Sequence, residues 1–182
     1  MSFLQSWVVL YNRDSISKMP PYPVLSESLR SQLAAIEPSE AGLLIYHPSK
    51  VTLRGGRTLE RVYVVAATAY LSRWGLYPEQ DPHKLWCRIE DVVSIELSSS
   101  RLPAKFANKV YKAGESGMGY HVFTVVFSDG TTQAYLAGNS VDFIEYPRGK
   151  GPSDIAGILP HVGRDQNPNQ PPNHHWCLFS DS

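Results

Sequence analysis

Four basic residues grouped around two adjacent glycines form the sharpest candidate binding site in the sequence. The group consists of Lys50, Arg54, Arg57 and Arg61, with Gly55-Gly56 at its centre. Such an arrangement lets side-chain cations and backbone amides hold a phosphate or another anion together. The alternative is a solvated hairpin, because lysine and arginine on an edge strand oppose aggregation and Glu60 offsets part of the positive field.

The last part of the chain carries two further sets of residues that can bind something. His174, His175 and Cys177 are ligand types that zinc prefers, but a site needs a fourth donor such as His47 or His161. Nothing in this proline- and asparagine-rich segment orders them, so we expect no metal. The apolar residues of the segment are Trp176, Leu178 and Phe179. We expect them to dock as a short strand on the edge of their own domain or on that of a partner protein.

No residue pattern in the chain indicates catalysis. The glycine-rich run from Gly114 to Gly119 continues into Tyr120-His121, which lacks the Lys-Ser/Thr pair of a nucleotide-binding loop. Ser116 has glycine two residues before it but not two residues after it, which a nucleophile elbow requires. We therefore expect a flexible hairpin tip here, no catalytic residues and no cofactor. An enzyme with spatially convergent groups stays open as an alternative.

Composition and charge narrow the class of protein. Among 182 residues, 17 are Lys or Arg and 17 are Asp or Glu, so no global positive field favours nucleic acid. Cys87 and Cys177 are too few and too distant in sequence for a disulfide framework, and Cys87 is most simply a small core residue. Residues 3–11 lack the basic start of a signal peptide. We expect a cytoplasmic protein, with peripheral attachment to an anionic membrane as an alternative.

A hairpin centred on Asp129-Gly130 is the strongest structural signal. This dipeptide favours a tight two-residue turn, which pairs Phe127 with Thr132 and Phe123 with Leu136. That register also pairs Val125 with Ala134 and places a largely apolar set on one face. His121 falls on the opposite, exposed side.

Other segments are assigned from their periodicity. We expect a strand in the first eleven residues, a Pro-rich linker to residue 24, a helix over 25–36, a short strand over 42–46, and an irregular strand around Val110-Tyr111. Residues 62–71 are apolar on both faces and predict a central strand, with a helix as the rival. Strands are expected around 85–89 and over 93–97, with Val93, Ile95 and Leu97 pointing inward. Short helices are expected after Ser140 and Ser153, and a mobile segment from Arg164.

The order of these elements resembles GRAM and pleckstrin-homology-like domains. The likeness covers roughly residues 40 to 146, and its clearest piece is Ile89-Glu90-Asp91-Val92-Val93-Ser94-Ile95-Glu96. It implies a mainly β, α+β domain: an antiparallel meander forming a small barrel or sandwich, with one N-terminal helix and one or two C-terminal helices. The expected divisions are 1–24, 25–163 and a flexible tail over 164–182.

The resemblance implies binding rather than catalysis. We expect a non-catalytic binding or scaffolding module that contacts a protein partner. Binding of an anionic lipid headgroup by the basic hairpin is the alternative, because the likeness places Lys50, Arg54, Arg57 and Arg61 near the basic first hairpin of domains that bind inositol phosphates.

Overall fold

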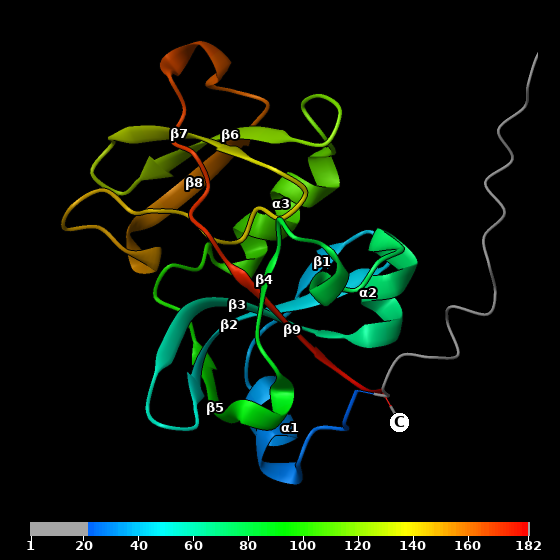
Figure 1. Cartoon of the computed structure of the whole chain (residues 1–182). Helices are drawn as coiled ribbons and strands as arrows, with labels where there is room; N and C mark the ends of the chain where they lie inside the picture. The colour runs from blue at the N-terminus through cyan, green and yellow to red at the C-terminus, as the bar shows by residue number, and fades with distance from the viewer. Residues whose placement is uncertain (1–21, 182) are drawn as a thin grey trace, which may run out of the picture.

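The computed structural model describes residues 22–181, which form two sheets joined by a helix (Figure 1). The strands of the large sheet are β1 (Ser39–Ala41), β2 (Leu44–Leu53), β3 (Thr58–Ala66), β4 (Leu85–Trp86), β5 (Val92–Leu97) and β9 (His175–Phe179). The small sheet contains β6 (His121–Phe127), β7 (Thr132–Ala137) and β8 (Ile155–Pro160). The helices are α1 (Glu27–Ala34), α2 (Ala67–Trp74) and α3 (Ala104–Ala113), with short 3-10 turns η2 (Pro78–Gln80), η3 (Ile89–Asp91), η4 (Pro152–Asp154) and η5 (Arg164–Gln166). The mainly β, α+β class is confirmed.

The two sheets do not close into a barrel within residues 22–181. The large sheet has the order β1-β2-β3-β9-β4, with β5 pairing with β2, and the small sheet has the order β7-β6-β8. In the large sheet β9 runs parallel to both β3 and β4, whereas the other pairs are antiparallel. Helix α3 packs on β1 and on β8, and so links the sheets (Figure 1). No helix in the described part of the chain has the length and apolar character needed to cross a membrane.

Strand β3 is the centre of the large sheet and is covered on both faces, as its sequence predicts. Val62 and Val64 face the core beneath α1, while Tyr63 and Val65 face a second core that includes residues of α2. The strand ends at Ala66, so the expectation of a strand as far as Leu71 is wrong there. Alanine at 66, 67 and 69 favours the helix that follows, and Gly75 ends that helix in the left-handed conformation.

The helix expected over 25–36 is confirmed as α1. Its Ser26 Oγ accepts a hydrogen bond from the Leu29 N–H, which caps the first turn. Leu29 and Leu33 are buried and pack with Val51 and Ile95 of the large sheet. The spacing of the leucines therefore predicted both the helix and its buried face.

The hairpin of β6 and β7 has its expected strands but a register shifted by one residue. Phe123 pairs with Tyr135 and Val126 with Thr132, because the turn has three residues. The Gly130 N–H donates to the Phe127 carbonyl, and Gly130 has φ +83°. A type I turn followed by a left-handed glycine is the usual three-residue solution. Phe123 is nevertheless buried, as are Val125 and Phe127. His121 was expected to be exposed, but it is buried, with only 5% of its surface exposed. Its Nδ1 lies 2.9 Å from the Gly138 carbonyl oxygen.

Two segments in the middle of the chain differ from their predicted structure. The residues around Val110-Tyr111 belong to α3 and not to an irregular strand, because Ala104, Ala107 and Val110 recur at helical spacing on its buried side. In β5 the buried residues are Val92 and Ile95, whereas Val93 and Leu97 are 52% and 64% exposed. The 3-10 turn η3 ends at Asp91, and β5 then begins with Val92 facing the core, so Val93 faces solvent and not the core as expected.

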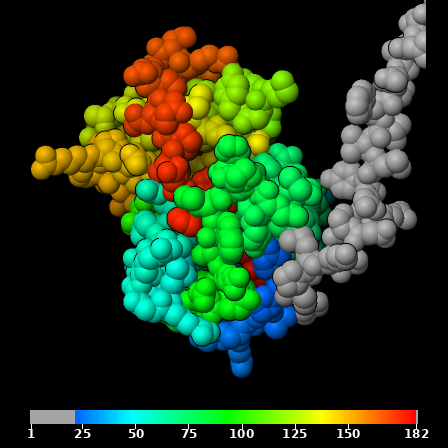
Figure 2. All heavy atoms as spheres, viewed as in Figure 1, coloured from blue at the N-terminus to red at the C-terminus, as the bar shows by residue number. Residues whose placement is uncertain are grey.

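The C-terminal part contains strands where helices and a mobile tail were expected. The segment after Ser140 is irregular, and Ser153 lies in η4, which leads into β8. Residues 175–179 form β9 inside the large sheet, so the expectation of a flexible tail is wrong for them. In Figure 2 the chain that leads into β9 runs in red from the small sheet, and its end is then largely covered by cyan and green neighbours. The expected N-terminal strand lies outside the described residues.

Candidate functional site

The four basic residues of the β2–β3 hairpin do not converge on one site. Lys50 Nζ lies 3.1 Å from Glu96 Oε2, and Arg61 Nε donates to the Asn173 carbonyl. Arg54 and Arg57 are exposed near the tip, where Arg54 lines a hollow beside the start of α1. The pairing of two of the four cations leaves Arg54 and Arg57 as the freely presented charges.

Two backbone amides at this hairpin tip are also occupied. The Arg54 N–H donates to the Asp91 carbonyl and the Gly56 N–H donates to the Leu53 carbonyl. Gly55 and Gly56 both have φ +85°, a conformation that glycine adopts without strain. The glycines therefore serve the turn itself, and the Arg54 and Gly56 amides are used within the protein.

The apolar residues of the last segment dock on the protein's own sheet. Trp176 and Leu178 are 3% and 2% exposed, and Phe179 is partly buried in the core beneath α1. The Trp176 ring stacks on Tyr63 with 4.9 Å between ring centroids. Trp176 and Leu178 are thus core residues of the large sheet and do not form an exposed docking strand. Within residues 22–181 no group of three or more His, Cys, Asp or Glu side chains is arranged to hold a metal ion.

Ser116 and His161 form a hydrogen-bonded pair at the rim of the small sheet. Ser116 Oγ lies 2.9 Å from His161 Nδ1, and His161 Nε2 lies 3.0 Å from the Ala113 carbonyl oxygen. Ser116 Oγ also accepts the Val122 N–H at 2.9 Å. The hydroxyl therefore closes the turn before β6, and we assign this pair a structural role. The expected flexible tip is tied down by these contacts.

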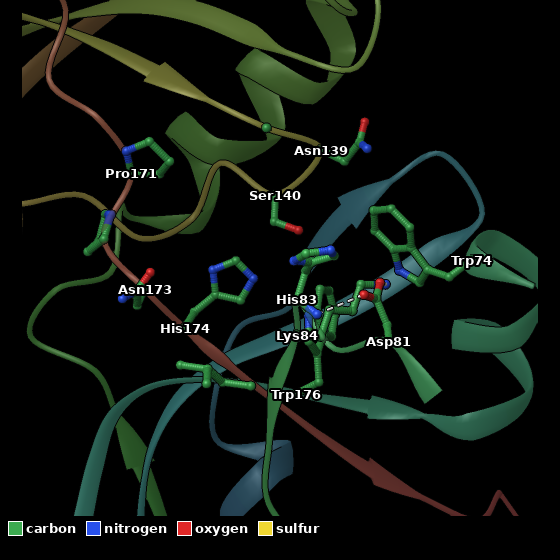
Figure 3. Close-up of a pocket in the computed structure, with 13 residues that line it drawn as sticks. Trp74, Asp81, His83, Lys84, Asn139, Ser140, Pro171, Asn173, His174 and Trp176 are labelled. Carbon is green, nitrogen blue, oxygen red and sulfur yellow. Dashed lines mark hydrogen bonds and ion pairs between the residues drawn. The ribbon is translucent and has the colours of Figure 1, made fainter. Parts of the chain in front are cut away.

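A cleft between the two sheets brings several polar and titratable side chains together (Figure 3). Its volume is about 360 Å³, and four separate stretches of chain build it. They are Trp74 at the end of α2, residues 81–85 leading into β4, residues 138–140 after β7, and residues 171–176 leading into β9. Figure 3 shows Ser140, His83 and His174 directed into the same opening. Aromatic walls with a few convergent polar groups are typical of a ligand site.

Lys84 is the cation of this cleft and is held by aromatic rings. Its Nζ lies 4.2 Å from the centroid of Trp74 and donates to the Tyr70 hydroxyl at 2.8 Å. Asp81 Oδ2 is 3.8 Å from the same nitrogen, too far for a good hydrogen bond. Burial lowers the pKa of the Lys84 ammonium group, and the Asp81 carboxylate opposes that shift. An ammonium group has three donors, so Lys84 keeps donor capacity for a ligand.

His174 supplies an uncharged imidazole at the other side of the cleft. Its ring meets Tyr63 edge-on at 4.9 Å and Trp176 at 5.6 Å between centroids. Burial among these rings lowers the pKa of His174 to about 4. The side chain is therefore neutral at pH 7 and offers hydrogen bonding without a charge.

Trp74 brings an unsatisfied polar group to the cleft wall. Its indole Nε1–H is buried without a hydrogen-bond partner among the described residues. A buried donor without an acceptor costs about 1–3 kcal/mol. A small rotation of the ring toward an acceptor in the cleft would recover part of that energy.

A buried polar cluster beside the cleft fixes the segment that carries Ser140. Asp142 is fully buried, and its carboxylate accepts the Tyr111 hydroxyl while its N–H donates to the Tyr63 hydroxyl at 3.2 Å. Burial raises the pKa of Asp142, and hydrogen bonds from its neighbours together with the charge of Arg101 oppose this rise. The cluster connects β3 of the large sheet with α3, and so holds the walls of the cleft together.

Comparison of the chain with protein-family models, with curated proteins and with solved structures found no match in any of the three. The cleft therefore has to be interpreted from its own geometry.

Little in the sequence indicates the residues that make this cleft. Asp142 and Glu145 lie three residues apart, but their segment is irregular, and Glu145 is exposed while Asp142 is buried. The sequence pattern indicates metal binding for His174 and strand docking for Trp176, and not a shared cleft. Lys84 stood alone between His83 and Leu85 without any pattern. Only the pairing of β9 beside β4 brings these residues together.

Proposed function

We propose that the protein is a non-catalytic binding module that holds an acidic segment of a partner protein in the cleft between its two sheets. The observation that carries this proposal is the position of Lys84, an ammonium group framed by Trp74 and Tyr70 inside an open cleft. A cation on an aromatic wall attracts a carboxylate while the rings contact the neighbouring apolar atoms of the ligand.

The other groups of the cleft favour a peptide over a smaller anion. Asn139 and Asn173 carry amides that can both donate to and accept from a peptide backbone. His174 is neutral at pH 7 and adds a further hydrogen-bonding group without a second charge. Pro171 and Pro172 provide flat apolar surface at the rim. Among the described residues, Asp81 is the one carboxylate of the lining; its Oδ1 accepts the His83 N–H, and its Oδ2 lies 3.8 Å from Lys84 Nζ, so it binds Lys84 only weakly.

Tryptophan fluorescence tests the proposal because Trp74 and Trp176 both line the cleft. A hexaglutamate peptide and a hexaglutamine peptide of equal length are titrated into the full chain. We expect a saturable change with hexaglutamate only. Lys84→Met keeps the aliphatic stem and removes the charge, and should weaken binding about tenfold, which corresponds to about 1.4 kcal/mol.

Lys105→Met is the matched control. Lys105 lies over the Phe106 ring in α3, so it also has an aromatic neighbour but does not line the cleft. Affinity for hexaglutamate should be unchanged in this variant. The proposal is wrong if neither peptide changes the fluorescence, or if Lys105→Met weakens binding as much as Lys84→Met while both variants keep the far-ultraviolet circular dichroism of the parent.

A further inference from the structure

The two cysteines of the chain lie side by side in the large sheet. The register of β4 and β9 pairs Leu85 with His175 and Trp86 with Trp176. The Cys87 N–H then donates to the Trp176 carbonyl at 2.9 Å, which continues the parallel ladder by one residue. Cys87 is therefore opposite Cys177, and each thiol affects the acidity of the other.

This position suits a disulfide. Neighbouring strands are about 4.8 Å apart, within the separation of about 4.4–6.8 Å that the α-carbons of a disulfide span. Residues opposite each other in a parallel pair point to the same face of the sheet, and both cysteines contribute to the core beneath α1. Neither cysteine forms a disulfide in the structure.

The two thiols differ in access and in acidity. Cys87 is partly exposed, whereas Cys177 is completely buried. The neighbouring Cys177 thiol and the positive charge of Arg57 lower the pKa of the Cys87 thiol, and burial opposes this shift. The neighbouring Cys87 thiol and burial raise the pKa of the Cys177 thiol. A more acidic, partly exposed thiol beside a buried one is the arrangement of an attacking and a resolving cysteine.

We propose that Cys87 and Cys177 form a reversible disulfide by exchange with small disulfides such as oxidised glutathione. The Cys87 thiolate attacks one sulfur of the small disulfide, so that a mixed disulfide forms and one small thiolate leaves. Cys177 then loses its proton to that thiolate and attacks the Cys87 sulfur, which releases the second small thiolate; this thiolate takes from water the proton that Cys87 gave up when it ionised. The protein loses two electrons and two protons, and the small disulfide gains both.

The dithiol lies on the face of the large sheet that α1 covers, whereas Trp176 and the cleft lie on the other face. The proposed exchange therefore does not require a ligand in the cleft. The bond would fasten β9 to β4 covalently. The sequence predicts that Arg57 binds an anion; in the structure its positive charge lowers the pKa of the Cys87 thiol.

Thiol trapping in glutathione buffers tests the inference. The full chain is equilibrated at a series of ratios of oxidised to reduced glutathione, quenched with acid, alkylated and measured by intact mass. We expect monomer with two alkylated cysteines at low ratios and monomer with neither alkylated and no glutathione attached at high ratios. Reduction should restore both thiols.

Single variants separate the two roles. Cys177→Val fills the buried position with a residue of similar size, and should stop at the mixed disulfide of Cys87 with glutathione. Cys87→Ser should leave Cys177 at least about tenfold slower to react than Cys87 is in Cys177→Val. The inference fails if the parent keeps two free thiols at every ratio, accumulates only a mixed disulfide, or forms only cross-linked dimers. Equal reactivity of the two single variants, with native circular dichroism, also overturns the assigned order.

Discussion

The Asp142 carboxylate accepts a 2.5 Å hydrogen bond from the Tyr111 hydroxyl in a site where Asp142 has no solvent exposure. Arg101 is also buried, at 3% exposed, and its charge opposes the rise in the Asp142 pKa, while its Nη2 donates to Ser39 Oγ at 3.2 Å. One buried carboxylate thus interacts electrostatically with a buried guanidinium group and accepts a tyrosine hydroxyl where the two sheets meet.

Removal of that carboxylate should destabilise the protein severely. Asp142→Ala removes the largest favourable charge interaction of the buried Arg101 and leaves the Tyr111 hydroxyl without its acceptor, so we expect a loss of about 3–5 kcal/mol in the free energy of unfolding. Urea denaturation followed by circular dichroism measures it. Asp165→Ala, at an exposed position, should change the same quantity by less than about 0.5 kcal/mol. Equal stability of the two variants would show that the cluster contributes nothing.

His174 should make the protein less stable as the pH falls from 6.5 to 4. The pKa of His174 is lowered to about 4 in the folded state, so between pH 4 and 6.5 the unfolded chain binds more protons than the native protein. The unfolding free energy then rises with pH across that window and is lost on acidification. About 2.5 pKa units correspond to roughly 3 kcal/mol.

His174→Phe isolates this contribution because it keeps a ring among Tyr63, Phe143 and Trp176 and removes the titration. Urea midpoints are compared at pH 7, 5.5 and 4. The parent should lose about 3 kcal/mol more than the variant between pH 7 and pH 4, while carboxylates and the other histidines affect both chains alike. Parallel losses in the two proteins would contradict the assignment.

Gly163 is at a position where any side chain collides with the small sheet. A Cβ there would lie 2.6 Å from Thr124 Oγ1 and 2.7 Å from Ala134 Cβ, and φ is +107°. We expect Gly163→Ala to lower the free energy of unfolding by about 2–4 kcal/mol through overpacking and backbone strain together. Gly42→Ala is the control, since Gly42 has φ +66° but open space around it, and strain alone should cost about 1 kcal/mol. Thermal melts that rank the two variants equally would exclude a collision.

Vesicle sedimentation tests the alternative of membrane attachment. Lys50 is paired with Glu96 and Arg61 with a backbone carbonyl, so only Arg54 and Arg57 remain at the hairpin tip. We expect phosphatidylserine vesicles to sediment no more protein than neutral vesicles at physiological ionic strength, where two exposed charges bind weakly. A saturable increase that disappears in the Arg54→Ala, Arg57→Ala double variant would establish the hairpin as a headgroup site.

Local patterns in the sequence predicted the elements whose neighbours are close in sequence. The spacing of Leu25, Leu29 and Leu33 gave α1 because one helix face packs on one sheet face. The apolar run from Val62 gave a central strand, but its end was missed because Ala67 and its neighbours fit either conformation. The hairpin register failed by one residue because Asp129-Gly130 serves a three-residue turn as well as a two-residue one.

Features that depend on distant pairing could not be obtained in the same way. The cleft combines Lys84 with His174, and the dithiol combines Cys87 with Cys177, only because β9 inserts beside β4. No local property of the segment before Trp176 distinguishes a docking strand from a mobile tail. The position of β9 depends on its pairing with the apolar strand β3, and this pairing exists only in the assembled sheet.

The insertion of β9 between β3 and β4 has a consequence for biosynthesis. Strand β3 pairs with β2 on one side and with β9 on the other, and Val62 is opposite His175 of β9. His175 is translated roughly 110 residues after Val62, so one edge of β3 stays unpaired until then. During that interval the nascent chain presents an unpaired, valine-rich border that can join any other extended polypeptide. We therefore expect chaperones to bind newly made molecules until β9 has paired with β3. Truncated products that lack β9 should be degraded by proteases or should aggregate.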